Sequence, residues 1–297
     1  GVRIGGNPGE TSTVLAGTIF FGGHKIVSDP KQGVFDQDAA SALIQKQDEM
    51  SKLTGNPALV QIFSETEQAM TKYIDFVCNL TSSPFLIDST EPMVRVAGLR
   101  YAEEVGLMDR AIYNSINVSA TREEIDALQD IQHECAIILA FNPQDPTIAG
   151  RRKVLDEGAL DLDKGLLPLS SELGITKPLI DTAVTAMGAG AGSAAAFTFV
   201  SKTIYGYPTG SGVHNAPSSW SWLRKHKKVN PEGFRTADVA SNLIVQMMGA
   251  DFVLYGPIEN ADRVFPVIAM ADVFAAETSN LEFGLEPPAD HPFKKLL

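Results

Sequence analysis

Short apolar runs alternate along the chain with longer segments in which apolar residues recur every three or four positions. The runs are rich in the β-branched, aromatic and aliphatic residues that favour strands. Most of them lack strict alternation with polar residues, which is typical of strands buried on both faces. Eight such runs predict strands, at 16–21, 58–63, 84–88, 110–114, 136–141, 178–181, 208–213 and 251–255.

Helical patterns fill the segments between these runs. Asp36 is placed to cap a helix that Gly55 can end, and 121–124 (TREE) forms a capping box. An alanine-rich helix is predicted over 193–205 and a last helix over 261–277. Strands and helices alternate without a linker, so the sequence predicts a single (β/α)8 TIM-barrel domain over residues 1–297, with a doubly wound sheet as the alternative.

Composition narrows the classes of partner. The 297 residues include 24 Lys and Arg against 36 Asp and Glu, a net charge of −12 at pH 7. Nucleic acids and anionic membranes select basic surfaces, so neither is expected as a partner. The sequence shows no signal peptide and no membrane-spanning apolar run, which favours a cytoplasmic protein without direct membrane insertion. Cys78 and Cys135 lie in apolar runs and are expected to be buried free thiols.

Polar residues interrupt the ends of several predicted strands, where a barrel carries its chemistry. Asp88, Asn114 with Ser115, Asp181, and His214 with Asn215 follow four strands, while Gln61 and Thr18 lie within two others. A single strand-end Asp can simply cap the next helix, but two carboxylates and two amides around one mouth favour a ligand site. No Lys or Arg stands at these ends, and Lys177 begins its strand. This argues against a Schiff-base aldolase and against a sugar-phosphate site built on cations.

Carboxylates accept paired N–H donors, and an asparagine supplies one acceptor and two donors. A planar heterocycle with an N–H/NH₂ edge and a carbonyl group matches this set of partners, and a pterin is such a ring.

The same strand ends carry a family resemblance. The stretches 85–90 (FLIDST), 113–117 (YNSIN), 179–182 (LIDT) and 212–218 (GVHNAPS) together resemble the pterin-binding corrinoid methyltransferases. Within that group the chain is similar, from 5–10 (GGNPGE) to 290–293 (DHPF), to the H subunits of tetrahydromethanopterin S-methyltransferases. The resemblance is strongest to soluble bacterial relatives that methylate tetrahydrofolate in glycine betaine metabolism.

The resemblance implies a homodimeric enzyme without a bound metal. It would move a methyl group from methylcobalamin or a methylated corrinoid protein to N5 of tetrahydrofolate, giving 5-methyltetrahydrofolate. One alternative is a tetrahydromethanopterin-specific H subunit within a membrane methyltransferase complex. A second alternative, from a different class, is a barrel subunit that serves mainly in docking.

The resemblance also suggests roles for single residues. Asp88 and Asp181 would bind the pterin ring and Asn114 would lie near N5 as the catalytic amide, with Asn215, Gln61 and Ser115 as further pterin contacts. Related methyltransferases carry a glutamate in place of Thr18 and an aspartate in place of Gln61, so the roles of these two positions stay open.

Other motifs allow simpler interpretations. Gly188 and Gly190 lie in the segment 188–193 (GAGAGS), which could contact a corrinoid, cradle a phosphate or pack closely. His214 is expected to be a hydrogen-bonded residue at the rim of the barrel. The histidines and cysteines lack the spacing of a metal cluster. The basic segment 224–228 (RKHKK) could attract an acidic group or be a solvated helix end, and Trp220 and Trp222 could contact a partner or pack in a core.

Overall fold

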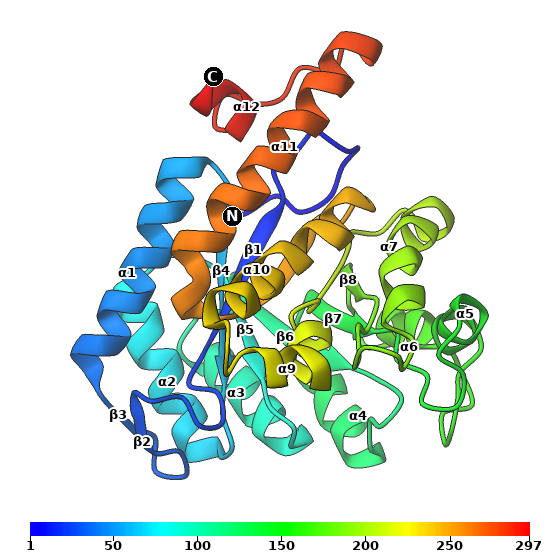
Figure 1. The fold of residues 1–297 in the computed structure, drawn as a ribbon. Coiled ribbons are helices and arrows are strands. Elements are labelled where there is room, and N and C mark those ends of the chain that lie inside the picture. The colour runs from blue at the N-terminus through cyan, green and yellow to red at the C-terminus, as the bar shows by residue number, and fades with distance from the viewer.

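The computed structural model describes all 297 residues and shows one closed parallel barrel (Figure 1). Its eight strands are joined in the order β1-β10-β9-β8-β7-β6-β5-β4 and back to β1. The predicted (β/α)8 fold is therefore confirmed, and the alternative of an open doubly wound sheet is wrong. The strands are β1 (Val14–Ile19), β4 (Ala58–Phe63), β5 (Phe85–Asp88), β6 (Ala111–Ile116), β7 (Cys135–Leu139), β8 (Lys177–Asp181), β9 (Thr209–Ser211) and β10 (Phe252–Pro257).

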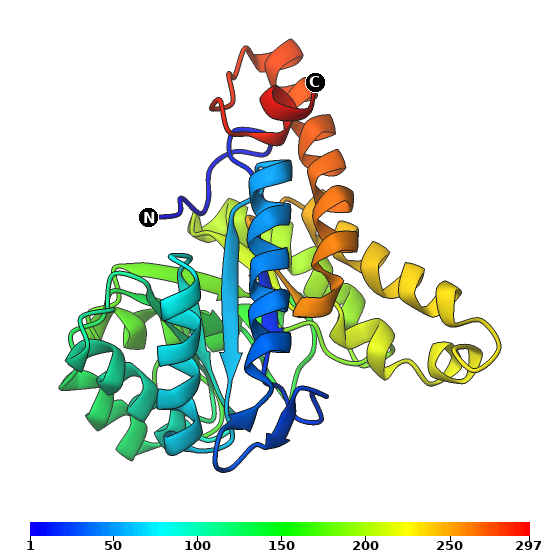
Figure 2. The same cartoon turned by 90° about the vertical axis from the view of Figure 1, so that its left-hand side faces the viewer.

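Helices surround the barrel on its outer side (Figures 1 and 2). They are α1 (Gln37–Thr54), α2 (Glu67–Leu80), α3 (Pro92–Glu104), α4 (Arg122–Gln129), α5 (Ile148–Asp156), α6 (Leu166–Glu172), α7 (Ala191–Tyr205), α8 (Asn215–Ser219), α9 (Ser221–His226), α10 (Pro231–Met247), the short helix η1 (Ile258–Asn260), α11 (Ala261–Phe283) and α12 (Pro292–Leu296). The predicted caps are present. The Asp36 carboxylate accepts from the backbone N–H of Ala39, and the Thr121 hydroxyl accepts from that of Glu124.

Apolar side chains fill the barrel and the space beneath the helices. The barrel interior is packed by residues that include Ala16, Leu86, Ile137 and Phe252. A larger cluster joins the outer faces of β4 to β8 to the helices that cover them. The interior is thus a solid core, as in other barrels of this type, and the open mouth is left for polar chemistry.

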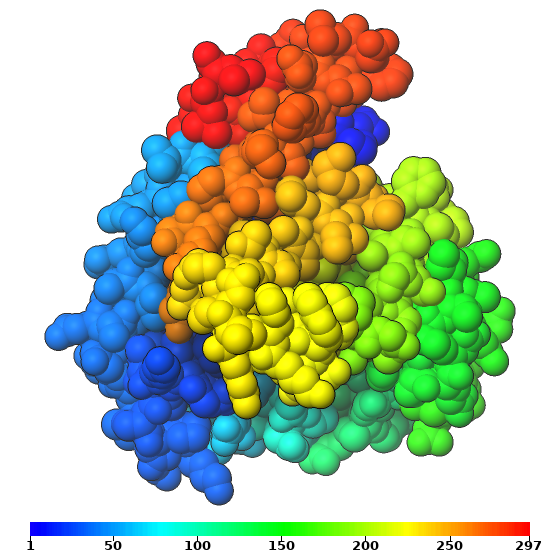
Figure 3. Space-filling view, viewed as in Figure 1, coloured from blue at the N-terminus to red at the C-terminus, as the bar shows by residue number.

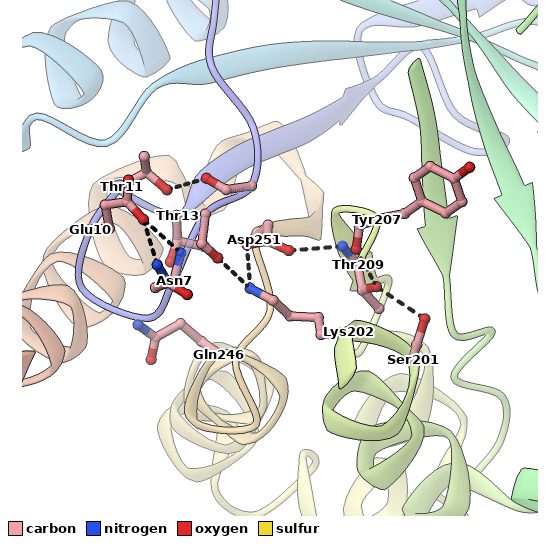
Figure 4. Close-up of polar contacts among 12 residues, drawn as sticks. Asn7, Glu10, Thr11, Thr13, Ser201, Lys202, Tyr207, Thr209, Gln246 and Asp251 are labelled. Atoms are coloured by element: carbon pink, nitrogen blue, oxygen red, sulfur yellow. Dashed lines mark hydrogen bonds and ion pairs between the residues drawn. The ribbon is translucent and has the colours of Figure 1, made fainter. Parts of the chain in front are cut away.

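The amino-terminal segment lies beside Lys202 and Asp251, just before the start of β10 (Figure 4). The Lys202 ammonium donates to the carbonyl of Gly6 at 3.0 Å and pairs with the Asp251 carboxylate at 2.6 Å. Asp251 also accepts from the backbone N–H of Thr209 at 2.9 Å. Gly9 is pressed against α11, where a Cβ atom would lie 2.5 Å from the carbonyl oxygen of Ala275. These contacts tie the start of the chain to α7 and α11, while Asp251 joins α7 to β9.

Several local expectations were wrong. A hairpin, β2 (Val27–Asp29) and β3 (Val34–Phe35), follows the first strand. That strand covers 14–19 rather than 16–21 because the chain turns at Phe20, whose φ is 63°. Cys78 and Cys135 are free but only half-buried.

The continuous helical segment formed by η1 and α11, Ile258–Phe283, is long and apolar enough to cross a membrane by length and composition. It packs here as the last barrel helix. Its Asp272 is buried and accepts hydrogen bonds from Thr13, Asn56 and Gln246.

Candidate active site

A cavity of about 330 Å³ opens at the carboxyl ends of the strands. Cavities of about 300–1,000 Å³ hold small-molecule ligands. The structure brings together there Gln61, Asp88, Asp181, His214 and Asn215, which the sequence singled out. Thr18, Phe21, Gly212, Leu254, Gly256 and Pro257 complete the wall.

A row of hydrogen bonds crosses three neighbouring strands and ends at Asp88. The Thr18 hydroxyl on β1 donates to Gln61 Oε1 on β4 at 3.1 Å. Gln61 Nε2 then donates to Asp88 Oδ2 on β5 at 2.7 Å. Thr18 and Gln61, whose roles the sequence left open, therefore orient the Asp88 carboxylate.

Asp181 lies on β8 and is 6% exposed. Its Oδ1 accepts from the backbone N–H of Ala183 at 2.7 Å. Burial raises the pKa of Asp181 to about 7, and the negative charge of Asp88 adds to that rise. Burial likewise raises the pKa of Asp88 to about 6, although the hydrogen bond from Gln61 opposes the shift. Both groups therefore change charge close to neutral pH, which is common at functional sites.

A buried arginine from a helix stands behind Asp88. Arg95 on α3 donates from Nη1 to the carbonyl of Ser89 at 2.7 Å and from Nη2 to Glu124 Oε1 at 2.6 Å. Its Nε donates to the hydroxyl of Tyr113 at 3.3 Å. The guanidinium thus fixes the backbone just after Asp88. Its positive charge opposes, in part, the rise in the pKa of Asp88 that burial causes.

A second buried arginine does the same for Asp181. Arg151 on α5 donates from Nε to the carbonyl of Thr182 at 2.9 Å and also bonds the carbonyl of Pro146. The positive charge of Arg151 opposes, in part, the rise in the pKa of Asp181 that burial causes. The two arginines reach these strand ends from helices rather than from the strands, and neither lines the cavity. Sequence reasoning missed both; the signal that could have found them was an arginine among apolar helix residues, as in 93–96 (MVRV).

Asn114 lies on β6 in register with Asp88, and Ser115 follows it through a cis peptide bond. Their side chains are 9% and 8% exposed and do not line the cavity. The parallel pairing of β6 with β7 shifts between Asn114 and Ile116, next to the carboxyl end of the strand. The structure therefore places Asn114 on the strand next to Asp88 but leaves both residues outside the cavity lining.

His214 and Asn215 lie at the start of α8. Burial lowers the pKa of His214 to about 4, so its imidazole is neutral at neutral pH. A Cβ atom at Gly256 would lie 2.6 Å from His214 Nδ1, so the glycine makes room for the ring. The expected hydrogen bond of the His214 ring is absent. A histidine that the sequence did not single out, His24, instead supports the cavity, since it stacks on Phe21 with ring centroids 4.3 Å apart.

Gly188 and Gly190 lie in the turn before α7, outside the cavity wall. Gly190 begins that helix with a φ of 94°, and a Cβ atom there would lie 2.7 Å from Pro146. Gly188 has a φ of 86° and open space around it. No group of three His, Cys, Asp or Glu side chains is arranged to hold a metal ion.

A family model described as "Tetrahydromethanopterin S-methyltransferase MtrH subunit" matches residues 1–288. The chain belongs to the MtrH family. It is 54% identical over 297 residues to the H subunit of tetrahydromethanopterin S-methyltransferase from Methanothermobacter thermautotrophicus, covering 100% of this chain and 96% of that protein. It is 47% identical, with the same coverage, to the H subunit of a putative mtx methyltransferase from Methanosarcina acetivorans.

Solved structures support the fold of this MtrH-family chain. Dihydropteroate synthase from Xanthomonas albilineans, in complex with 7,8-dihydropteroate, superposes with a TM-score of 0.58 at 16% identity, covering 90% of this chain and 94% of that one. Dihydropteroate synthase from Yersinia pestis gives a TM-score of 0.57 at 12% identity, covering 87% and 93%.

The comparisons correct the expected substrate. The chain was expected to methylate tetrahydrofolate as a soluble enzyme of glycine betaine metabolism, and that expectation was wrong. Relatives at 48–54% identity over the whole chain are H subunits of tetrahydromethanopterin S-methyltransferase. The alternative stated from the sequence is the better description.

Proposed function

We propose that this MtrH-family chain is a methyltransferase subunit that moves a methyl group between N5 of tetrahydromethanopterin and the cobalt of a corrinoid on a partner protein. The observation that carries the proposal is the pair of carboxylates, Asp88 and Asp181, in the cavity at the carboxyl ends of the strands. Full-length relatives named for tetrahydromethanopterin support the choice of pterin.

The two carboxylates suit the N–H edge of a pterin. Ionised carboxylates form strong charge-assisted hydrogen bonds with N–H donors. Such donors would replace the water that Asp88 and Asp181 lose on burial, so binding would favour their ionised forms. Gln61 holds one oxygen of Asp88 and Ala183 one oxygen of Asp181, and the remaining oxygens are available to the ring.

Methyl transfer is an in-line displacement, and the corrinoid supplies or receives the methyl group at cobalt. When methyl leaves N5, the electron pair of the C–N bond returns to nitrogen, so N5 must carry a proton for departure. In the reverse direction the N5 lone pair would attack the methyl carbon, the carbon–cobalt bond would break with its electron pair left on the corrinoid as Co(I), and the resulting cationic amine would lose its proton. The protein contributes orientation and control of charge at N5.

Two asparagines are candidates for the amide at N5: Asn114 by family resemblance and Asn215 by its position in the cavity wall. A neutral amide can accept from a protonated N5 or donate to a neutral one. A carboxylate at the same place would hold the cation too firmly for a reversible transfer. His214, neutral at neutral pH, avoids placing a further positive charge beside it.

The corrinoid protein is proposed as a second subunit of a multisubunit complex, as the word subunit in the relatives' names suggests. Gly188 and Gly190 lie in an exposed turn near α7 and are proposed as a contact for that partner. The docking role considered from the sequence is compatible with this arrangement but would leave Asp88 and Asp181 without a purpose.

The test is anaerobic spectroscopy of the purified protein with methylcobalamin and either tetrahydromethanopterin or tetrahydrofolate. We expect Co(I) to form with tetrahydromethanopterin and 5-methyltetrahydromethanopterin to accumulate. Asp88→Asn should abolish most of this signal, whereas Glu91→Gln, at an exposed acidic residue outside the cavity, should retain it. Absence of demethylation with either pterin, together with absence of pterin binding by calorimetry, would refute the proposal.

A further inference from the structure

The loop after β1 supplies an aromatic side chain to the wall of the cavity. Phe21 is half-buried and is the only Phe, Tyr or Trp side chain in that wall. The chain just beyond this loop, the hairpin β2–β3, lies in blue at the lower left surface of the molecule in Figure 3. Gly22, Gly23 and Lys25 are exposed, so the loop is open to solvent on its outer side. A wall residue carried by such a loop needs contacts that hold it in place.

A tight turn brings His24 back against Phe21. The backbone N–H of His24 donates to the carbonyl of Phe21 at 2.9 Å. Gly23 within the turn has a φ of 77°, in the left-handed region that favours glycine. The imidazole of His24 stacks on the phenyl ring of Phe21, with the centroids 4.3 Å apart and an angle of 9° between the planes. His24 is 2% exposed, so one face of Phe21 rests on a buried ring.

Two contacts fix the imidazole of His24 itself. Its Nδ1 accepts from the backbone N–H of Phe20 at 3.1 Å, so the neutral ring carries its proton on Nε2. Nε2 lies 2.9 Å from Oε1 of Glu259 in η1. β1 and β10 are neighbours in the barrel, and η1 directly follows β10. The contact between His24 and Glu259 therefore joins the loop after β1 to the segment after the adjacent strand.

We propose that Phe21 is the stacking surface for the planar ring of the ligand, and that His24 and Glu259 are positioning residues that hold Phe21 in the wall. The inference rests on the proposed function, because the pterin is the ring concerned. Carboxylates bind the edge of a planar heterocycle through its N–H groups, whereas an aromatic side chain binds its face. Phe21 thus adds a contact that Asp88 and Asp181 do not provide. Because the contacts of His24 exist without a ligand, the wall is formed before the ring arrives.

Calorimetry with tetrahydromethanopterin tests the stacking surface. Phe21→Leu keeps an apolar side chain but removes the flat ring, and it should raise the Kd about three- to tenfold. Glu259→Ala should raise the Kd by a similar factor. Glu259→Gln keeps an oxygen acceptor for the Nε2–H of His24, and its Kd should stay within about twofold of the wild-type value. Phe199→Leu and Glu282→Ala, at exposed positions outside the cavity, are the matched controls.

The stoichiometry of binding and the rate separate positioning from a general loss of structure. A variant that is partly unfolded would bind fewer equivalents of pterin with an unchanged Kd. The proposal expects full stoichiometry with a raised Kd for Phe21→Leu and Glu259→Ala. It also expects a kcat within about threefold of the wild-type value, since stacking holds the ring equally in the ground state and the transition state.

Hydrogen exchange tests the contact between His24 and Glu259 without any pterin. The N–H of Phe20 is protected by Nδ1 of His24. His24→Ala and Glu259→Ala should therefore speed the exchange of segment 20–24 about three- to tenfold, and Glu259→Gln should not. Unchanged exchange in Glu259→Ala would overturn the positioning roles, and a Phe21→Leu variant that binds pterin as tightly as the wild type would overturn the stacking surface. A wild type that binds no pterin would refute the proposed function and with it the stacking surface, while the exchange measurement would still decide the positioning roles.

Discussion

Replacing Asp181 by asparagine should stabilise the protein at alkaline pH. Asparagine is nearly isosteric and can still accept the hydrogen bond from the Ala183 N–H through its side-chain oxygen. The native pKa of Asp181 is about 7, against an ordinary value of 3.8. The folded state therefore binds the proton more tightly than the unfolded chain, and stability falls as the pH rises from about 4 to about 7.

The size of the effect follows from the shift. A rise of about three pKa units corresponds to about 4 kcal/mol of unfavourable ionisation above neutral pH, which is an upper limit for a single buried group. At about 2 °C per kcal/mol for a protein of this size, Asp181→Asn should raise the melting temperature at pH 8 by up to about 8 °C. Near pH 4, where Asp181 is protonated in the folded state, most of this gain should disappear.

The assay is thermal unfolding followed by circular dichroism at several pH values, with Glu91→Gln as a control for loss of one exposed acidic charge. A gain at pH 8 that vanishes on acidification supports the raised pKa. An equal change at pH 4 and pH 8, or a loss of stability at pH 8, would show that burial does not penalise the Asp181 charge. The Asp181→Asn variant should also lose pterin binding. The cost in stability of the ionised Asp181 carboxylate would then be linked to its role in binding the ligand.

Three further outcomes are expected. Binding of tetrahydromethanopterin, measured by calorimetry, should weaken as the pH falls from about 8 to about 5, because protonated Asp88 and Asp181 no longer accept N–H donors. Proton release should accompany binding near neutral pH. Either Asn114→Ala or Asn215→Ala should lower kcat by about 10²–10⁴-fold with little change in pterin affinity. The asparagine whose replacement lowers kcat is the one that lies at N5. Equal kcat in both variants would contradict an amide at N5. Arg95→Leu should destabilise the fold by about 3–5 kcal/mol in denaturant unfolding, because it leaves the buried Glu124 carboxylate without a cationic partner and with only the Tyr113 hydroxyl as a donor. Adding Glu124→Leu should recover part of that loss, and a single variant as stable as the wild type would contradict the buried pair.

The barrel and the polar residues at its mouth could be predicted from the sequence because both depend on local patterns. Parallel strands buried on two faces form apolar runs, and a polar residue at the carboxyl end of such a run is expected to lie at the open end of the barrel. Asp88, Asp181 and Asn215 were found in this way. The cavity itself, and the hydrogen bonds from Thr18 through Gln61 to Asp88, depend on which strands are neighbours, since β1 and β5 both lie next to β4.

The arginines could not be predicted by the same reasoning. Arg95 and Arg151 lie in helices, and each has a partner far away in the sequence: the Glu124 carboxylate for Arg95 and the Thr182 carbonyl for Arg151. A charge run such as 151–153 is usually a solvated surface, but only Arg151 of the three is buried. A pattern reports which face of a helix is apolar, whereas the partners of a buried charge depend on tertiary packing.

The direction of the bonds between Thr18, Gln61 and Asp88 has a consequence for where a proton can reside. As long as Thr18 donates to Gln61, the Gln61 amide must present N–H to Asp88 Oδ2, so that oxygen can only accept. A proton taken up by Asp88 is then confined to Oδ1. Placing it on Oδ2 would require the Gln61 amide to turn over and Thr18 to become an acceptor. The direction of the Thr18 hydrogen bond on β1 therefore determines which oxygen of the Asp88 carboxyl group on β5 can carry the proton.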